Sequence, residues 1–229
     1  MRLIDAAADL LLGASCPGCE HPGWGLCQAC RAHLEHHRIN RHRPDPCPDR
    51  FPDTWAAAEY DVVLQRLLRQ YKERGAWQLQ RRLGACLARS VGALLLETAA
   101  GDAAGARVVL VPAPSADAAV RERGLDATAV LARSAAAQLG RIGVRMQVRQ
   151  LLRQGSLVAD QSGLDAQQRA ANLAGGLRLR GSVPTGAGAI LVDDLVTTGA
   201  TLVEMRRVVE AAGMHVLGAA VVAATQRRS

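Results

Sequence analysis

The segment AILVDDLVTTGAT, residues 189–201, decides the fold of this 229-residue chain. Four apolar residues run directly into two adjacent carboxylates, Asp193 and Asp194, which is the pattern of a buried strand that ends in polar groups. The loop that follows, and that opens a helix, consists of Thr197, Thr198, Gly199, Ala200 and Thr201. Backbone N–H groups of such a loop, with the free helix N-terminus behind them, can bind a phosphate. Two acids above that phosphate suit the vicinal hydroxyls of a ribose.

Apolar patterns on either side of this segment alternate between strand and helix. Strands are predicted over 107–111, 144–148 and 189–192 and in the run that begins at 216. Helices are predicted over 62–71, 78–97, 126–139 and 200–212. This alternation predicts an α/β fold with a mainly parallel sheet flanked by helices. Open sheets of this kind bind ligands at the carboxyl ends of their strands, where the 189–201 loop lies.

Two Cys-x-x-Cys pairs stand near the N-terminus. They consist of Cys16, Cys19, Cys27 and Cys30. Four thiolates on two tight turns match the tetrahedral coordination of a structural zinc, with Gly18 supplying conformational freedom to one turn. A redox dithiol pair and an unliganded set are the alternatives. Cys47 stands alone, and Cys86 lies within a predicted helix, where it is expected to be a core residue.

Composition limits the class of protein and suggests its partners. Apolar residues make up 49% of the chain and aromatic residues 3%, so a packed core of Ala, Val and Leu is expected rather than disorder. The net charge of +7 indicates an anionic partner such as phosphate or nucleic acid, with genome base composition as the alternative. The longest apolar run, 216–224, is too short to cross a bilayer, and acids interrupt the N-terminal segment. We expect a cytoplasmic protein without a membrane span.

The chain divides into a zinc-ribbon module at 1–36, a Pro- and Arg-rich linker at 37–53 and a main domain at 54–229. A basic cluster spans the end of the module and the linker. It consists of Arg31, His33, His36, His37, Arg38, Arg41, His42 and Arg43. We interpret it as a surface patch, with additional metal ligands as the alternative. The patch could contact nucleic acid, although no interleaved aromatic residues support base stacking.

The segment 189–201 closely resembles the phosphoribosyl pyrophosphate (PRPP) motif of the type I phosphoribosyltransferases. Further segments narrow the resemblance. They are YKERG at 71–75, VPAPS at 111–115, RERG at 121–124 and QSGL at 161–164. With the cysteine pairs, their order resembles the ComF family, which includes ComFC-like and GntX-like proteins. The resemblance implies a type I phosphoribosyltransferase fold with an N-terminal zinc ribbon and, in some bacteria, a role in DNA uptake during natural transformation.

The resemblance also implies roles for individual residues. Asp193 and Asp194 would hold the ribose hydroxyls of PRPP, and residues 197–201 its 5′-phosphate. The pyrophosphate loop would be formed by Pro112, Ala113, Pro114 and Ser115, and its charge partners would be Arg121, Arg123 and Lys72. The alternative for the two arginines is a solvated helix face. A lid over the site would include Gln161, Arg169 and Asn172. Mg²⁺ would coordinate the pyrophosphate and ribose hydroxyls.

Two departures from the family pattern bear on function. Leu125, Asp126 and Ala127 stand where the family usually has Phe-Asn-Gln, which puts transferase chemistry in question. The second cysteine pair of a double ribbon is reduced to Cys47, so we expect one zinc rather than two. No general base is identified from the sequence.

The leading hypothesis is a ComF-like phosphoribosyltransferase that binds PRPP with magnesium. A second hypothesis keeps the nucleotide site for sensing and gives the ribbon and linker a docking role for single-stranded DNA or a competence helicase. A third is a nucleobase salvage phosphoribosyltransferase, for which no base-specificity segment is recognised.

Overall fold

A six-stranded sheet forms the centre of the molecule. The computed structural model describes residues 15–99, 107–155 and 176–225. The strand order is β1-β2-β8-β7-β3-β4, parallel throughout except for β1, which is antiparallel to β2. The strands are β1 (Asn40–His42), β2 (Thr54–Glu59), β3 (Arg107–Pro112), β4 (Gln147–Val148), β7 (Ala187–Val196) and β8 (His215–Ala224). The predicted α/β fold with a mainly parallel sheet is confirmed.

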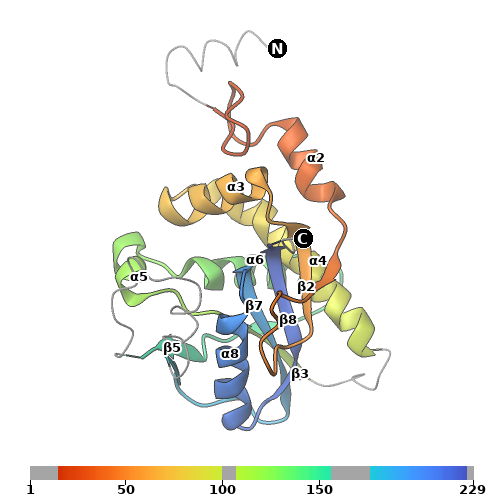
Figure 1. The fold of residues 1–229 in the computed structure, drawn as a ribbon, viewed down its shortest axis with the longest axis vertical. Coiled ribbons are helices and arrows are strands. Elements are labelled where there is room, and N and C mark those ends of the chain that lie inside the picture. Colours follow the sequence, from red (N-terminus) through yellow and green to blue (C-terminus); the bar gives the residue numbers. More distant parts are fainter. Residues whose placement is uncertain (1–14, 100–106, 156–175, 226–229) are drawn as a thin grey trace.

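Helices cover both faces of the sheet (Figure 1). Helices α4 (Gln80–Ala99) and α6 (Ala127–Arg141) pack on one face, and α8 (Ala200–Ala211) packs on the other. A small sheet of β5 (Leu152–Gln154) and β6 (Leu177–Leu179) lies beside α8. Along β7, Ile190 and Val192 belong to the first core, whereas Ala189 and Leu191 belong to the second. This alternation is the two-residue period of a strand that is buried on both faces.

Side-chain caps and a left-handed glycine set several helix boundaries. Helix α3 (Val62–Glu73) begins after Asp61, whose carboxylate accepts a hydrogen bond from the backbone N–H of Leu64. Asp126 caps α6 in the same way through Ala129. Helix α5 (Asp117–Arg123) ends at Gly124, which has φ +72°. Acids at N-caps satisfy backbone donors that would otherwise lack partners, so these boundaries follow from local sequence.

Several elements differ from the expectation. Strand β2, with the sequence TWAAAE, was not predicted because its residues do not alternate, and five of its six residues are buried. The strand expected over 144–148 is reduced to β4, and a 3₁₀ turn (Trp77–Leu79) precedes α4. The segment expected to be a linker carries β1, and α2 (Gln28–His36), α5, β5 and β6 are also additions. Each addition is short, so its sequence holds little periodicity.

Residues 15–36 pack directly onto the main domain. Cys30 and Leu34 of α2 are buried in the same core as Leu64 of α3 and Leu87 of α4. Arg89 of α4 donates to the backbone carbonyls of Leu34, at 3.0 Å, and His37, at the C-terminal end of α2. Figure 1 shows α2 beside α3 at one end of the molecule. Among the described helices, none is both long and apolar enough to span a bilayer.

Candidate functional site

Asp193 and Asp194 lie within the last four residues of β7, which ends at Val196, before the loop that leads into α8. The Asp194 side chain is buried, and the backbone N–H of Asp194 donates to Asp193 Oδ1 at 2.8 Å. Thr197 and Thr198 are exposed, and Gly199, with φ +79°, is the residue before α8. The predicted strand, loop and helix are therefore present, but the strand expected to end at residue 192 continues to Val196, so the two acids lie inside it rather than after it.

Lys72, near the end of α3, reaches this acid pair. Its Nζ lies 2.7 Å from Asp194 Oδ2, and its side chain is 37% exposed. Burial tends to raise the pKa of Asp194, but the nearby charge of Lys72 outweighs it and the pKa falls below its usual value. The pKa of Asp193 is raised well above its usual value, by burial and then by the charge of Asp194. The neighbouring acids thus differ: Asp194 is held ionised, and Asp193 retains a high affinity for a proton or another positive partner.

The candidate pyrophosphate loop begins at the same edge of the sheet. Pro112 ends β3 opposite Val192 of β7, and the N–H of Ala113 donates to the carbonyl of Val192 at 2.8 Å. The N–H and Oγ of Ser115 both donate to the Asp126 carboxylate, at 3.3 and 3.1 Å. Since Asp126 also caps α6, its carboxylate fixes the loop to that helix.

The other candidate residues occupy different positions. Arg123 donates to the backbone carbonyls of Ala119, at 3.0 Å, and Lys72, at 2.8 Å, so it connects α5 to the end of α3. Arg121 is exposed on α5. The lid candidates Gln161, Arg169 and Asn172 lie outside the described residues.

The segment 37–53 contacts the candidate phosphate loop, which the sequence did not indicate. A Cβ atom placed on Gly199 would lie 2.5 Å from Phe51 Cε2 and 3.2 Å from Pro44 Cγ. Arg50 forms a 2.7 Å ion pair with Glu210 of α8, and its carbonyl accepts a bond from Arg206. These contacts join residues far apart in the chain, so no local pattern could have predicted them.

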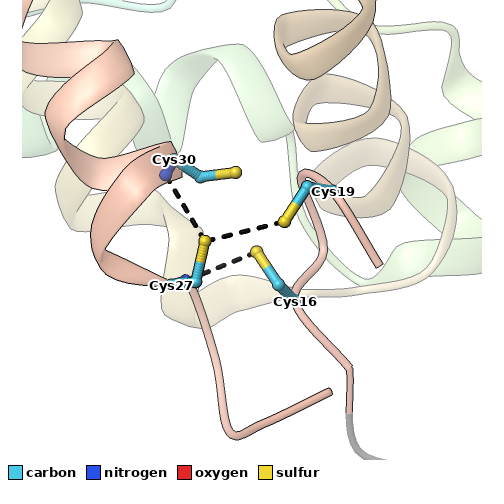
Figure 2. A group of neighbouring side chains, drawn as sticks. All are labelled: Cys16, Cys19, Cys27 and Cys30. Carbon is cyan, nitrogen blue, oxygen red and sulfur yellow. Dashed lines mark hydrogen bonds between the residues drawn. The ribbon is translucent and has the colours of Figure 1, made fainter. Parts of the chain in front are cut away.

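The four N-terminal cysteines converge on one point (Figure 2). All are free thiols, and their sulfur atoms lie within 4.8 Å of one another. Cys19 Sγ and Cys27 Sγ are 3.6 Å apart. A tetrahedral zinc with Zn–S bonds of about 2.3 Å places its sulfur ligands about 3.8 Å apart, so the cluster fits this ion. The backbone N–H groups of Cys27 and Cys30 point at Cys16 Sγ and Cys27 Sγ, at 3.3 and 3.4 Å.

The thiol environments also favour a cation. Burial raises the pKa of Cys30, and the neighbouring sulfur atoms raise it further. In Cys16, hydrogen bonds from backbone N–H groups outweigh burial and lower the pKa to about 7. Gly18 has a different role from the one expected: its φ is not left-handed, and a Cβ atom there would lie 2.9 Å from Cys30 Sγ. The turn between Cys16 and Cys19 therefore needs a glycine because a Cβ atom would not fit beside Cys30.

The remaining cysteines and the basic cluster are also placed. Cys86 is buried in the core, as expected, and Cys47 is half-buried with its Sγ 3.7 Å from Arg43 Nη2. Arg41 pairs with Asp53 at 2.6 Å and with Glu97 at 3.0 Å. The prediction that the basic cluster forms a surface patch is wrong for His33 and His37. Both are partly buried, and their side chains face Asp61.

A protein-family model and a solved structure are similar to this chain. Residues 126–229 match the sequence model of the phosphoribosyl transferase domain. No curated protein matches the chain. Among solved structures, the chain is similar to adenine phosphoribosyltransferase from Saccharomyces cerevisiae, in complex with D-2,5-dideoxy-2,5-imino-altritol 1,6-bisphosphate and adenine. The identity is 14%, over 86% of this chain and 89% of that one, with a TM-score of 0.37. The chain is therefore similar to the phosphoribosyl transferase domain family over residues 126–229, and its α/β fold is phosphoribosyltransferase-like.

Proposed function

We propose that this protein is a ComF-like phosphoribosyltransferase that uses PRPP with magnesium. One observation carries the proposal. The ion pair between Lys72 and Asp194 lies near the C-terminal end of β7, next to Asp193, on the strand that leads into the loop at the N-terminus of α8. This arrangement supports the proposal, because acceptors suited to ribose hydroxyls precede a loop with donors suited to a phosphate.

Each part of PRPP has a matching group. Asp193 and Asp194 accept hydrogen bonds from the vicinal ribose hydroxyls, while the N–H groups and hydroxyls of residues 197–201 bind the 5′-phosphate. The loop 112–115 lies across the edge of the sheet from Asp193 and would face the pyrophosphate. Carboxylate and phosphate oxygens are the ligands that magnesium prefers, so the donor set fits this ion. When bound, magnesium would neutralise charge on the departing pyrophosphate.

The reaction breaks the bond between the ribose anomeric carbon and pyrophosphate and forms a bond from that carbon to the acceptor. Its transition state has oxocarbenium character, so positive charge develops on the sugar. Asp194, held ionised by Lys72, supplies negative charge next to that sugar. The rest of the rate enhancement comes from holding both reactants in position.

The test is calorimetric titration with PRPP and Mg²⁺, followed by measurement of pyrophosphate release with a panel of nitrogenous acceptors. Asp194→Ala is expected to weaken PRPP binding by about 10–100-fold, because hydrogen bonds to a charged group are lost. Glu73→Gln is the matched control, since Glu73 follows Lys72 on α3 but forms an exposed pair with Arg69. Absence of PRPP binding by the unaltered protein would refute the site. Binding without turnover would favour the sensing hypothesis.

The proposed role in DNA uptake depends on the ComF resemblance. Fewer residues of the basic cluster are available to contact DNA than the sequence suggested. Arg41 is engaged by two carboxylates and stacks on Trp55 at 5.0 Å, so its charge is already partnered. Arg38 and Arg43 are exposed. Binding of single-stranded DNA that falls with salt and with Arg38→Ala and Arg43→Ala would support docking, and unchanged binding would oppose it.

A further inference from the structure

Outside the two sites described above, a second group of metal-ligating side chains converges where α2 meets the start of α3. It consists of His33, His37 and Asp61, hereafter the His-His-Asp cluster. His33 Nε2 lies 2.5 Å from Asp61 Oδ2 and 3.0 Å from His37 Nε2. His37 Nε2 lies 3.5 Å from the same carboxylate oxygen. Three ligand atoms, from the C-terminal end of α2 and from the residue that precedes α3, therefore point at one position.

The protein backbone holds these three groups in place. His33 lies in the last turn of α2, and His37 is the residue that caps the C-terminal end of that helix. Arg89 binds the carbonyls at the end of α2, including that of His37. Asp61 uses Oδ1 to accept the N–H of Leu64 at 2.9 Å, which leaves Oδ2 directed at the histidines. The cluster is thus a consequence of how α3 begins and α2 ends.

Protons alone do not satisfy this geometry. His33 Nε2 is within hydrogen-bond distance of both Asp61 Oδ2 and His37 Nε2, but an imidazole nitrogen carries one proton or one lone pair. If that proton points at Asp61, the nitrogen cannot accept a bond from His37. If the nitrogen accepts from His37, it faces the carboxylate lone pair to lone pair. The two partners are themselves 3.5 Å apart, so one proton cannot align with both. If both imidazoles donate to Asp61 Oδ2 instead, their two N–H groups are held with the nitrogens only 3.0 Å apart and no bond between them.

We infer that the His-His-Asp cluster is a second metal site, which binds Zn²⁺ through His33 Nε2, His37 Nε2 and Asp61 Oδ2. A cation between the three atoms uses all of their lone pairs at once. Two imidazoles and one carboxylate form a common ligand set for zinc.

The size of the cluster is compatible with zinc. Ligand atoms about 2.0–2.1 Å from a tetrahedral zinc lie about 3.4 Å apart. The observed distances of 2.5, 3.0 and 3.5 Å are slightly shorter on average, so binding would open the cluster modestly. The side chains of His33 and Asp61 are 37% and 33% exposed, which leaves room for a water molecule as the fourth ligand.

This site would add a second metal ion to each chain and a second connection between the cysteine-bearing segment and the main domain. The sequence led us to expect one zinc per chain, whereas the two clusters together give two. The cysteine site lies within residues 16–30, but the second site would connect α2 to α3 directly. It would therefore fix the position of the ribbon on the main domain, independently of PRPP binding.

The test is the zinc content of the full chain, measured by mass spectrometry of the metal after saturation with Zn²⁺ and removal of excess ion. Two zinc ions per chain are expected for the unaltered protein, and one for His33→Gln and for His37→Gln. His36→Gln is the matched control, since His36 lies on the same helix but bonds to the Ala32 carbonyl, and it should keep two.

Asp61→Asn separates a metal ligand from a structural cap. Asparagine caps a helix as well as aspartate does, so α3 should remain intact, yet a neutral amide binds zinc poorly. We expect one zinc per chain and, after chelation of all metal, a helical circular-dichroism signal equal to that of the unaltered protein. X-ray absorption should then show only Zn–S distances of about 2.3 Å, whereas the unaltered protein also shows distances of about 2.0–2.1 Å. One zinc in the unaltered protein, or two in all variants, would overturn the inference.

Discussion

Lys72 Nζ lies 2.7 Å from Asp194 Oδ2, so the single lysine of the chain is bound to the more buried acid of the pair at the end of β7. The contact joins the end of α3 to the centre of the sheet. It also makes two adjacent aspartates unequal, because Lys72 compensates the charge of Asp194 whereas Asp193 lies beside that charge. Their substitutions should therefore have opposite effects on stability.

Asp194→Asn should destabilise the protein and Asp193→Asn should stabilise it at pH 8. The first change removes the partner of Lys72, which we expect to cost about 1–3 kcal/mol, less than for a fully buried pair because Lys72 is partly exposed. The second removes an acid whose ionisation is opposed by burial and by Asp194. Both variants should lose PRPP affinity. Urea unfolding of the two variants measures the effect, and destabilisation by Asp193→Asn would contradict the assignment.

The stability difference for Asp193→Asn should depend on pH. The pKa of Asp193 is raised in the folded state, so its protonated form contributes stability below the unfolded pKa of about 3.9, and this is lost as pH rises through the folded pKa. The variant should match the unaltered protein near pH 4 and exceed it at higher pH. For Asp194→Asn the deficit should be present above pH 4 and shrink as pH falls below it, because that pKa is lowered. Melting temperatures from about pH 2.5 to about pH 8 provide the measurement, because the two windows lie on either side of the unfolded pKa of about 3.9.

Lys72→Met should weaken PRPP binding by about 10–100-fold, since Asp194 then lacks the charge that keeps it ionised. Lys72→Arg keeps the charge and should retain part of the affinity. Calorimetry reports both, with Glu73→Gln as the exposed neighbour that should change nothing. If Lys72→Met binds PRPP as tightly as the unaltered protein does, Lys72 does not contribute to the binding site.

Gly199→Ala should disrupt the candidate phosphate loop for two separable reasons. Its φ of +79° disfavours any residue with a Cβ atom, and that atom would overlap Phe51, at 2.5 Å. Phe51→Ala in the same chain should relieve the overlap but not the backbone cost, so the double variant is expected to recover part of the lost stability. A double-mutant cycle from thermal unfolding measures the coupling. Simple additivity would show that Phe51 does not contact the loop in solution.

Cys19→Ser should lower the zinc content by one ion per chain, because three thiolates bind a structural zinc less tightly than four. A loss of about 2 kcal/mol corresponds to a fall in melting temperature of about 4–8 °C for a chain of this size. Cys47→Ser is the control, since Cys47 lies outside the cluster. Unchanged zinc content in Cys19→Ser would exclude this cysteine as a ligand.

The sequence predicted the elements whose patterns are long or whose caps are local. Continuous apolar residues identified β7, Asp126 marked the start of α6, and the spacing of Cys16 to Cys30 identified the thiol cluster. Strand β2 was missed because TWAAAE owes its burial to neighbouring strands rather than to alternation. The ion pair of Lys72 with Asp194 and the His-His-Asp cluster depend on which helices pack together, and a local pattern does not encode that.

Strand β1 has a consequence for how the chain avoids self-association. It pairs with β2, which would otherwise be the outermost strand and would present unpaired backbone groups next to five buried residues. An uncovered strand of this kind is a template for pairing with another copy. The three residues of β1 are polar or basic, and Arg41 is anchored to Asp53 and Glu97, so the exposed border is short and charged. Strand β1, within the segment 37–53, thus disfavours edge-to-edge association of two copies of the chain.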